Sequence, residues 1–209
     1  MSYATDTVAD FTTRLASNDS TPGGGAAAGL VGALGAALAA MVANLTVGKP
    51  KYAEVDAEMR QVVLKAEVLR EELVAHMDRD TEAFDEVMAC YRMAKESDAE
   101  KQARTAALQT ALDRAAEASL AICRDTAQVL PLAQAVAERG NKMLVSDAGC
   151  AAAFAEAGLA AALLTVRINC NSLADRERAD LLWAEGQWLE QQVVAQRDAV
   201  LQIVYARLG

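Results

Sequence analysis

Residues that build β-sheets are scarce in this sequence. Aromatic residues make up 4% of the 209 residues, whereas hydrophobic residues make up 53%. The abundance of alanine and leucine, with only three prolines, favours helices and leaves little material for a sheet. A chain of this length can bury one substantial core. We therefore expect an all-α fold, a single-domain helical bundle over residues 1–209.

Zinc-site spacing is also absent. The chain has one histidine, His76, and its four cysteines stand singly with no C-x-x-C pair. The first fifteen residues carry acids and hydroxyls where a signal peptide has a basic region and an apolar core. We expect a cytoplasmic, reduced protein without a bound metal.

Positive charge is in deficit. The formal net charge is -9 and the sequence pI is near 4.7. Nucleic-acid binding draws its affinity from lysine and arginine side chains that neutralise phosphates, and anionic lipid attracts the same side chains. The composition predicts neither a nucleic-acid nor a membrane partner.

One long uncharged run, Ala26–Leu45, has the length of a membrane span. It consists mostly of alanine and glycine, and no basic cluster or aromatic belt flanks it. Because a helix that is apolar on every face is buried in a core or an interface, we expect a central, oligomer-forming helix. Its glycines permit close approach of another helix. A second nearly apolar helix is expected from about Cys150 to Cys170.

Hydrophobic spacing predicts the other helices. A capping box is expected where Ser97 precedes Glu100 by three residues. We expect the chain to turn or bend near His76–Asp80 and to break or kink at Pro131. The helices expected from these patterns cover residues 5–15, 54 onward, 98–130 and 175–208.

A glycine-rich turn, Pro22–Gly25, precedes the central apolar helix. Three residues without Cβ leave successive backbone N–H groups exposed beside the positive end of a helix dipole. Such a turn binds anions or carbonyl oxygens. It matches neither a dinucleotide fingerprint nor a P-loop, and a plain turn is the alternative.

Acidic residues form a second candidate. Asp78 and Asp80 stand near the expected helix junction, and Asp80 serves either as a helix cap or in catalysis. We expect His76 to be an exposed surface residue and leave it out of the site.

Two further polar islands stand beside apolar segments: Gly140-Asn141 through Ser146-Asp147-Ala148-Gly149, and Arg167-Ile168-Asn169. A simple N-cap accounts for one residue of the first island. Arg167 either completes a helix C-terminus or binds a ligand.

In this order, the motifs resemble the cyclodeaminase domain of the formiminotransferase-cyclodeaminase family. The resemblance covers Phe11 to about Asp175, and the run from Thr21 to Tyr52 is its most specific part. Ser119 stands where the family is expected to have proline, and Cys150 and Cys170 replace aliphatic residues. The matching segments are Phe11 with Leu15-Ala16-Ser17, Thr21–Gly25, Gly32–Leu38, Met41–Thr46, Gly48-Lys49 with Tyr52, Asp78, Asp80, Ala83-Phe84, Val87-Met88, Gly140-Asn141, Ser146–Gly149 and Arg167–Asn169 with Leu173 and Asp175.

The resemblance implies an all-helical homodimer that binds folate in a cleft made partly by the glycine-rich turn, without a metal, a nucleotide or a permanently bound cofactor. A free-standing chain lacks the fused formiminotransferase that supplies a cyclodeaminase. This favours hydrolysis of 5,10-methenyltetrahydrofolate to 10-formyltetrahydrofolate. The alternatives are formiminotetrahydrofolate cyclodeaminase, which releases ammonia, and a non-catalytic helical interaction module.

Roles for individual residues follow from the resemblance. Asp147 or Asp80 is expected to be the general base, with Ser146 and Asn141 orienting water or the pterin. Lys49 and Arg167 are candidates for holding the substrate's glutamate carboxylates. The remaining expected substrate-binding residues are Pro22, Gly23, Gly24, Gly25 and Tyr52.

Overall fold

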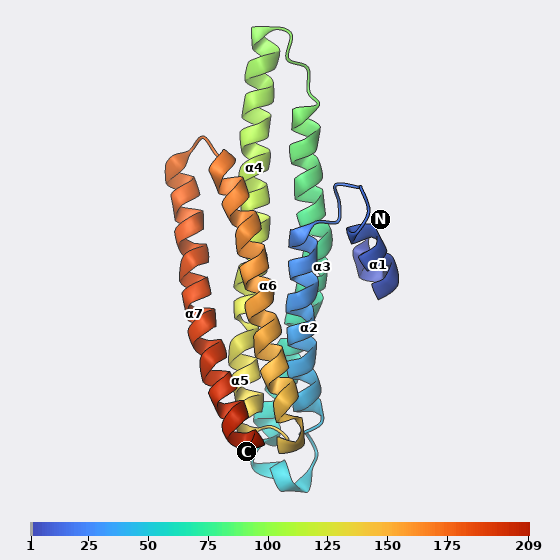
Figure 1. Ribbon diagram of the computed structural model, residues 1–209, viewed down its shortest axis with the longest axis vertical. Helices are drawn as coiled ribbons and strands as arrows, with labels where there is room; N and C mark the ends of the chain where they lie inside the picture. Colours follow the sequence, from blue (N-terminus) through green and yellow to red (C-terminus); the bar gives the residue numbers. More distant parts are fainter. Residues whose placement is uncertain (1) are drawn as a thin grey trace.

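The computed structural model describes residues 2–209, and within them the chain forms seven α-helices and no strand. The helices assemble into an elongated bundle (Figure 1). The all-α prediction is confirmed, whereas a single domain over 1–209 stays a prediction. The helices are α1 (Val8–Leu15), α2 (Gly24–Asn44), α3 (Asp56–Tyr91), α4 (Asp98–Ala127), α5 (Val129–Arg139), α6 (Val145–Ser172) and α7 (Arg176–Leu208), with 3₁₀ turns at Tyr3–Thr5, Pro50–Val55 and Lys142–Leu144.

The two alanine- and glycine-rich helices, α2 and α6, form the centre of the bundle. Helix α2 packs against α3 and α6, and α6 also packs against α4 and α7. Glycines allow these helices to pack closely, because a Cβ atom would collide with the neighbouring helix. A Cβ added at Gly29 would lie 2.9 Å from the Leu73 carbonyl oxygen, and one added at Gly158 would lie 3.0 Å from the Gly32 nitrogen. The prediction of two buried small-residue helices is confirmed.

Two stretches, Gly24–Asn44 and Lys142–Ser172, are long and apolar enough to cross a membrane by length and composition. In the bundle, 61% and 50% of their most apolar windows are buried. The core helix of a soluble bundle has the same composition, because it too is apolar on every face. Burial against neighbouring helices thus accounts for much of this apolar surface.

Three helix boundaries differ from expectation. The predicted bend at residues 76–80 is wrong: α3 runs unbroken from Asp56 to Tyr91, since no glycine or proline interrupts it. The break before α5 falls at Gln128, so Pro131 lies in the first turn of α5, where a missing N–H costs no helical hydrogen bond. Helix α6 begins at Val145, five residues before the expected start. The capping box at Ser97 is confirmed.

The ends of α3 and α4 form a hairpin that extends beyond the other helices (Figure 1). None of residues 88–110 is buried, and burial resumes at Ala111. The hairpin is therefore the part of the bundle with the least core beneath it.

Candidate active site

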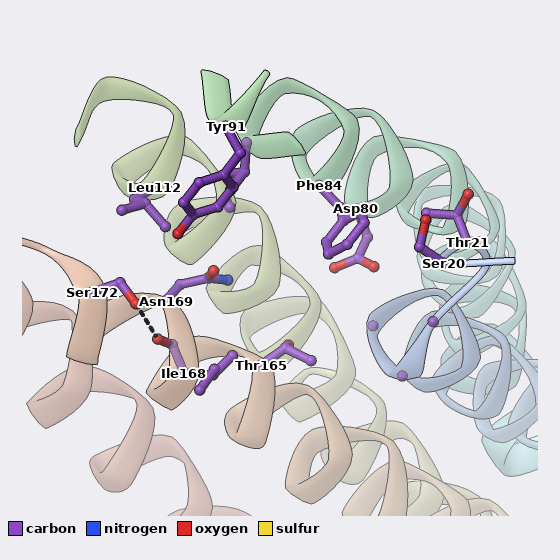
Figure 2. A pocket seen from close by; sticks show the side chains of 15 residues that line it. Ser20, Thr21, Asp80, Phe84, Tyr91, Leu112, Thr165, Ile168, Asn169 and Ser172 are labelled. Carbon is purple, nitrogen blue, oxygen red and sulfur yellow. Dashed lines mark hydrogen bonds between the residues drawn. The ribbon is translucent and has the colours of Figure 1, made fainter. Parts of the chain in front are cut away.

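A cavity of about 330 Å³ lies where the N-terminus of α2 meets α3, α4 and α6 (Figure 2). Small-molecule sites commonly fall between about 300 and 1,000 Å³. Among the described residues that line it, Asp80 is the one carboxylate, and lysine, arginine and histidine are missing. The lining residues are Ser20, Thr21, Gly23, Gly24, Gly25, Asp80, Phe84, Val87, Tyr91, Leu112, Ala115, Thr165, Ile168, Asn169 and Ser172.

Asp80 and the glycine-rich turn meet directly. The N-cap of α2 is Gly23, which has no side chain to accept from the first-turn N–H groups. The Asp80 carboxylate, on α3, lies beside this first turn, and the Ala26 N–H stabilises its charged form. A Cβ added at Gly25 would lie 2.0 Å from Asp80 Oδ1. The site therefore requires glycine at position 25.

The environment of Asp80 raises its pKa. Burial raises the pKa of Asp80 above its ordinary value of 3.8. The Ala26 N–H, the charge of His76 and the Ser119 hydroxyl each lower that pKa, but burial outweighs them. A carboxyl whose pKa is raised toward neutrality is suited to accept and return a proton in catalysis.

The wall opposite Asp80 comes from α6. Figure 2 shows Thr165, Ile168 and Asn169 across the cavity from Asp80 and Phe84. The amide of Asn169 offers both a donor and an acceptor. An acid, a polar amide and exposed helix N–H groups thus surround an otherwise apolar space.

A second polar cluster lies at the opposite end of α2. The Tyr52 hydroxyl accepts from the Lys142 N–H at 3.1 Å and donates to Asn141 Oδ1 at 3.3 Å. Asn141 Nδ2 donates to the Leu45 carbonyl at 3.2 Å, and the Asn141 N–H donates to Thr46 Oγ1 at 2.8 Å. Asn141 is buried, and these bonds tie the loop after α2 to the start of α6. This cluster resembles a structural tie more than an open site.

The predicted site residues consequently form two groups. Asp147, partly exposed, and the exposed Ser146 and Lys49 lie at the Asn141 end. The eighteen residues of α6 that separate Asp147 from Thr165 span about 27 Å at 1.5 Å per residue. Pro22 is buried just before the glycine-rich turn. Within one chain, the cavity contains Gly23, Gly24, Gly25 and Asp80 of the predicted set.

Arg167 belongs to neither group. It is exposed on α6, and its guanidinium carbon lies 4.6 Å from the ring centroid of Trp183 on α7. This cation–π contact turns the side chain toward α7, away from the cavity. Its predicted role in binding substrate stays a prediction.

The comparisons with known proteins agree with this geometry over most of the chain. A family model described as formiminotransferase-cyclodeaminase matches residues 7–187. The chain belongs to the formiminotransferase-cyclodeaminase family. A member from Methylorubrum extorquens, a methenyltetrahydrofolate cyclohydrolase, is 49% identical over 175 residues, which cover 84% of each chain.

More distant members of the formiminotransferase-cyclodeaminase family match too. The rat formimidoyltransferase-cyclodeaminase is 32% identical over 79% of this chain, which spans only 30% of the rat protein. The crystal structure of formiminotetrahydrofolate cyclodeaminase from Thermotoga maritima superposes with a TM-score of 0.88, at 31% identity and over 98% of both chains. The family resemblance inferred from the motifs is confirmed.

Sequence reasoning missed several residues around Asp80. The expectation that His76 is exposed is wrong: its exposed fraction is 5%, and Nε2 lies 2.8 Å from Asp125 Oδ2 on α4. Asp125 stands between Arg124 and the buried Thr126 in the charge-rich helix α4, so its sequence context did not indicate a buried partner. Ser119, read as a packing difference, contacts the Asp80 carboxylate.

Proposed function

We propose that this protein is a methenyltetrahydrofolate cyclohydrolase. Its substrate, 5,10-methenyltetrahydrofolate, holds one carbon as a cationic amidinium between N5 and N10. Water adds to that carbon, the C–N5 bond breaks, N5 gains a proton, and the product is 10-formyltetrahydrofolate with one proton released. The reaction needs a group that removes a proton from water and another, or the same, that protonates N5.

The observation that carries this proposal is the position of Asp80 in the cavity. The ionised Asp80 carboxylate attracts the cationic amidinium of the substrate, because no lysine or arginine among the described residues of the cavity lining opposes this attraction. Asp80 accepts the proton of the attacking water and returns it to N5 as the ring opens. Its raised pKa suits both halves of this cycle.

The other lining groups orient the reactants. The Gly24 and Gly25 N–H groups, at the positive end of α2, hold the oxygen that develops on the reacting carbon. Asn169 and Thr165 hydrogen-bond the pterin from the α6 side. Lys49, Tyr52, Asn141 and Arg167 remain proposals as substrate-binding residues, and none of the four lines this cavity.

We also propose a homodimer built on the outward face of α2 and α6, called the α2–α6 face below. Its exposed apolar side chains run from Ile168, beside the cavity, through Leu34 and Phe154 to Leu45 at the far end. Helix α2 carries no charge along its whole length. A face of this kind suits a second copy of the chain, because burying it would desolvate no charge from α2.

A twofold axis that lies in this interface, perpendicular to the long axis of the bundle, would exchange the two ends of the bundle. The Asp147 end of one subunit would then lie beside the glycine-rich turn of its partner. In this dimer, Asp147 and Ser146 of one subunit would lie near the partner's cavity, whereas within one chain they lie far from the cavity. We propose that they complete the site across the interface.

The proton transfers as written need only carboxylates, backbone N–H groups and water. We therefore propose that the enzyme acts on its folate substrate with no permanently bound cofactor or metal. We also propose that the enzyme is cytoplasmic. Because its net charge is negative, we propose that it has no nucleic-acid or membrane partner.

The test is the loss of methenyltetrahydrofolate absorbance with purified protein, beside an ammonia-release assay on formiminotetrahydrofolate. Both reactions pass through a tetrahedral carbon between the same two nitrogens, and the Thermotoga relative is named for the second. Fast hydrolysis with little ammonia supports the proposal. Ammonia release without hydrolysis would make the protein a cyclodeaminase, and neither activity would leave a helical interaction module.

A further inference from the structure

A hydrogen-bonded histidine–aspartate pair lies one helical turn from Asp80. His76, on α3, points Nε2 at Asp125 Oδ2 on α4 at 2.8 Å. The His76 side chain is 6% exposed and that of Asp125 is 25% exposed. Burying an imidazole beside a carboxylate costs desolvation, so the pair needs a compensating role or a compensating partner.

The hydrogen bond fixes which ring nitrogen can exchange a proton. An ionised Asp125 only accepts hydrogen bonds, so His76 Nε2 must carry its proton in order to donate. A change in the charge of His76 therefore takes place at Nδ1. Gln128 Nε2 donates to the other oxygen of Asp125 at 3.2 Å, which holds the carboxylate in place.

His76 and Asp80 are four residues apart on the unbroken helix α3, so their side chains leave the same face. The positive charge of His76 acts on Asp80 and opposes the effect of burial. Ser119, on α4, completes the surroundings: its hydroxyl lies beside both the Ala115 carbonyl and the Asp80 carboxylate and has one proton to donate.

Other charges are turned away from this cluster. Helix α2 brings none, because residues 24–44 carry no ionisable side chain. On α3, Arg79 pairs with Glu72 at the surface. On α4, Arg124 pairs with Glu117 and with Glu185 of α7. Asp78, on α3, accepts from the Ser2 hydroxyl and the Tyr3 N–H, so Asp125 is the acid that the His76 ring contacts and Asp80 is an acid on which its charge acts.

We propose that His76, held by Asp125, is a positioning residue that keeps Asp80 in its ionised, water-activating form. This inference rests on the proposed function, in which Asp80 must start each cycle as the base. Asp125 orients the imidazole through Nε2, and a positive charge on that imidazole stabilises the Asp80 carboxylate. The partly buried Asp125 thus acts on Asp80 through the His76 ring, and neither His76 nor Asp125 touches the substrate.

The experiment is the pH profile of kcat/KM for His76→Gln and Asp125→Asn in the full chain. Without the neighbouring cation, the pKa of Asp80 rises, so the acid limb moves to higher pH. We expect kcat/KM at pH 5.5 to fall by about threefold or more relative to wild type, with a much smaller change at pH 8. Asp125→Asn keeps an oxygen that can accept from Nε2, so its fold should be preserved.

Arg79→Gln is the matched control, because it removes a cation next to Asp80 in sequence but at the surface. Its profile should match wild type. Unchanged acid limbs in both His76→Gln and Asp125→Asn, with a lower melting temperature alone, would overturn the proposal and leave the pair a structural one.

A readout besides activity separates this inference from the proposed function. The carboxyl carbon of Asp80 can be titrated by NMR in protein labelled at aspartate, with its signal identified by its loss in Asp80→Asn. If wild type lacks hydrolase activity, the proposed function fails, yet the titration still decides the inference. A titration of Asp80 that is the same in wild type and Asp125→Asn would contradict it.

Discussion

The two ends of the bundle carry polar clusters of opposite character. At the glycine-rich end, Asp80 and the first-turn N–H groups of α2 face a cavity. At the other end, Asn141 and Tyr52 bond to each other and to nearby backbone. In sequence both clusters are short polar islands beside apolar helices. The two clusters differ in their hydrogen bonding: the polar groups of a binding site can still bond to a ligand, whereas those of a structural cluster are bonded to the protein itself.

The largest effect is expected for Asp80→Asn. Removing the general base should lower kcat/KM by about a hundredfold or more. Glu82→Gln, two residues along on the exposed side of α3, is the control and should keep wild-type activity. Steady-state hydrolysis at pH 7 measures both, and an Asp80→Asn enzyme with near-normal activity would remove the cavity from the mechanism.

Asp147→Asn tests whether the far end takes part. We expect at least about a tenfold loss of kcat/KM, since the side chain assists at the partner's cavity. Mixing equal amounts of Asp80→Asn and Asp147→Asn subunits should then raise the activity to about one quarter of wild type, because half of the dimers are mixed and each has one intact site. Failure to regain activity after subunit exchange would place both acids in one subunit or exclude Asp147.

Gly25→Ala tests the contact between the turn and Asp80. The added Cβ would push the Asp80 carboxylate from its place, so we expect about a tenfold loss of activity and about 1–3 kcal/mol of destabilisation. Gly24→Ala is the matched control, because its Cβ would meet only Thr165 Cγ2, at 3.9 Å. Urea unfolding and kinetics on both variants make the comparison, and equal behaviour would contradict it.

Asn141→Ala should act on stability. Its loss leaves buried groups of the structural tie unpaired, and we expect about 1–3 kcal/mol of destabilisation. KM for the folate substrate should stay within about twofold if the amide binds only protein. A large rise in KM with unchanged unfolding would instead make Asn141 a substrate-binding residue, as the sequence predicted.

The smallest effect concerns pH and stability. Because burial raises the folded-state pKa of Asp80, the stability this group contributes is full below 3.8 and is lost as pH rises through the raised value. Asp80→Asn should therefore gain stability relative to wild type as the pH rises through that window. Urea unfolding of both proteins between pH 3 and pH 8 checks this, and a constant difference would contradict it.

Much of the fold was predictable because local patterns decide it. The capping box at Ser97 marks the start of α4, and the apolar runs predicted α2 and α6 as buried helices, although α6 begins five residues earlier than expected. The bend expected near Asp80 had no glycine or proline to cause it, and the structure has none. Stretches rich in charge are not by themselves helix breaks.

The candidate site was only partly predictable. Asp80 and Gly25 were each identified, but their contact depends on how α2 packs on α3, which one sequence does not reveal. The same holds for His76 and Asp125, which are 49 residues apart. Local polarity made Asn141 look like a ligand-binding residue, although its partners in the fold are Leu45 and Thr46.

The protruding α3–α4 hairpin has a consequence for how a ligand arrives. Phe84, Val87 and Tyr91 from one arm and Leu112 from the other wall the cavity, at the root of the segment with no buried residue. Segments with few buried contacts open locally at a lower free energy than the whole fold. The cavity therefore borders the part of the bundle with the fewest buried residues, and we expect local opening of this hairpin to widen the cavity before the core unfolds.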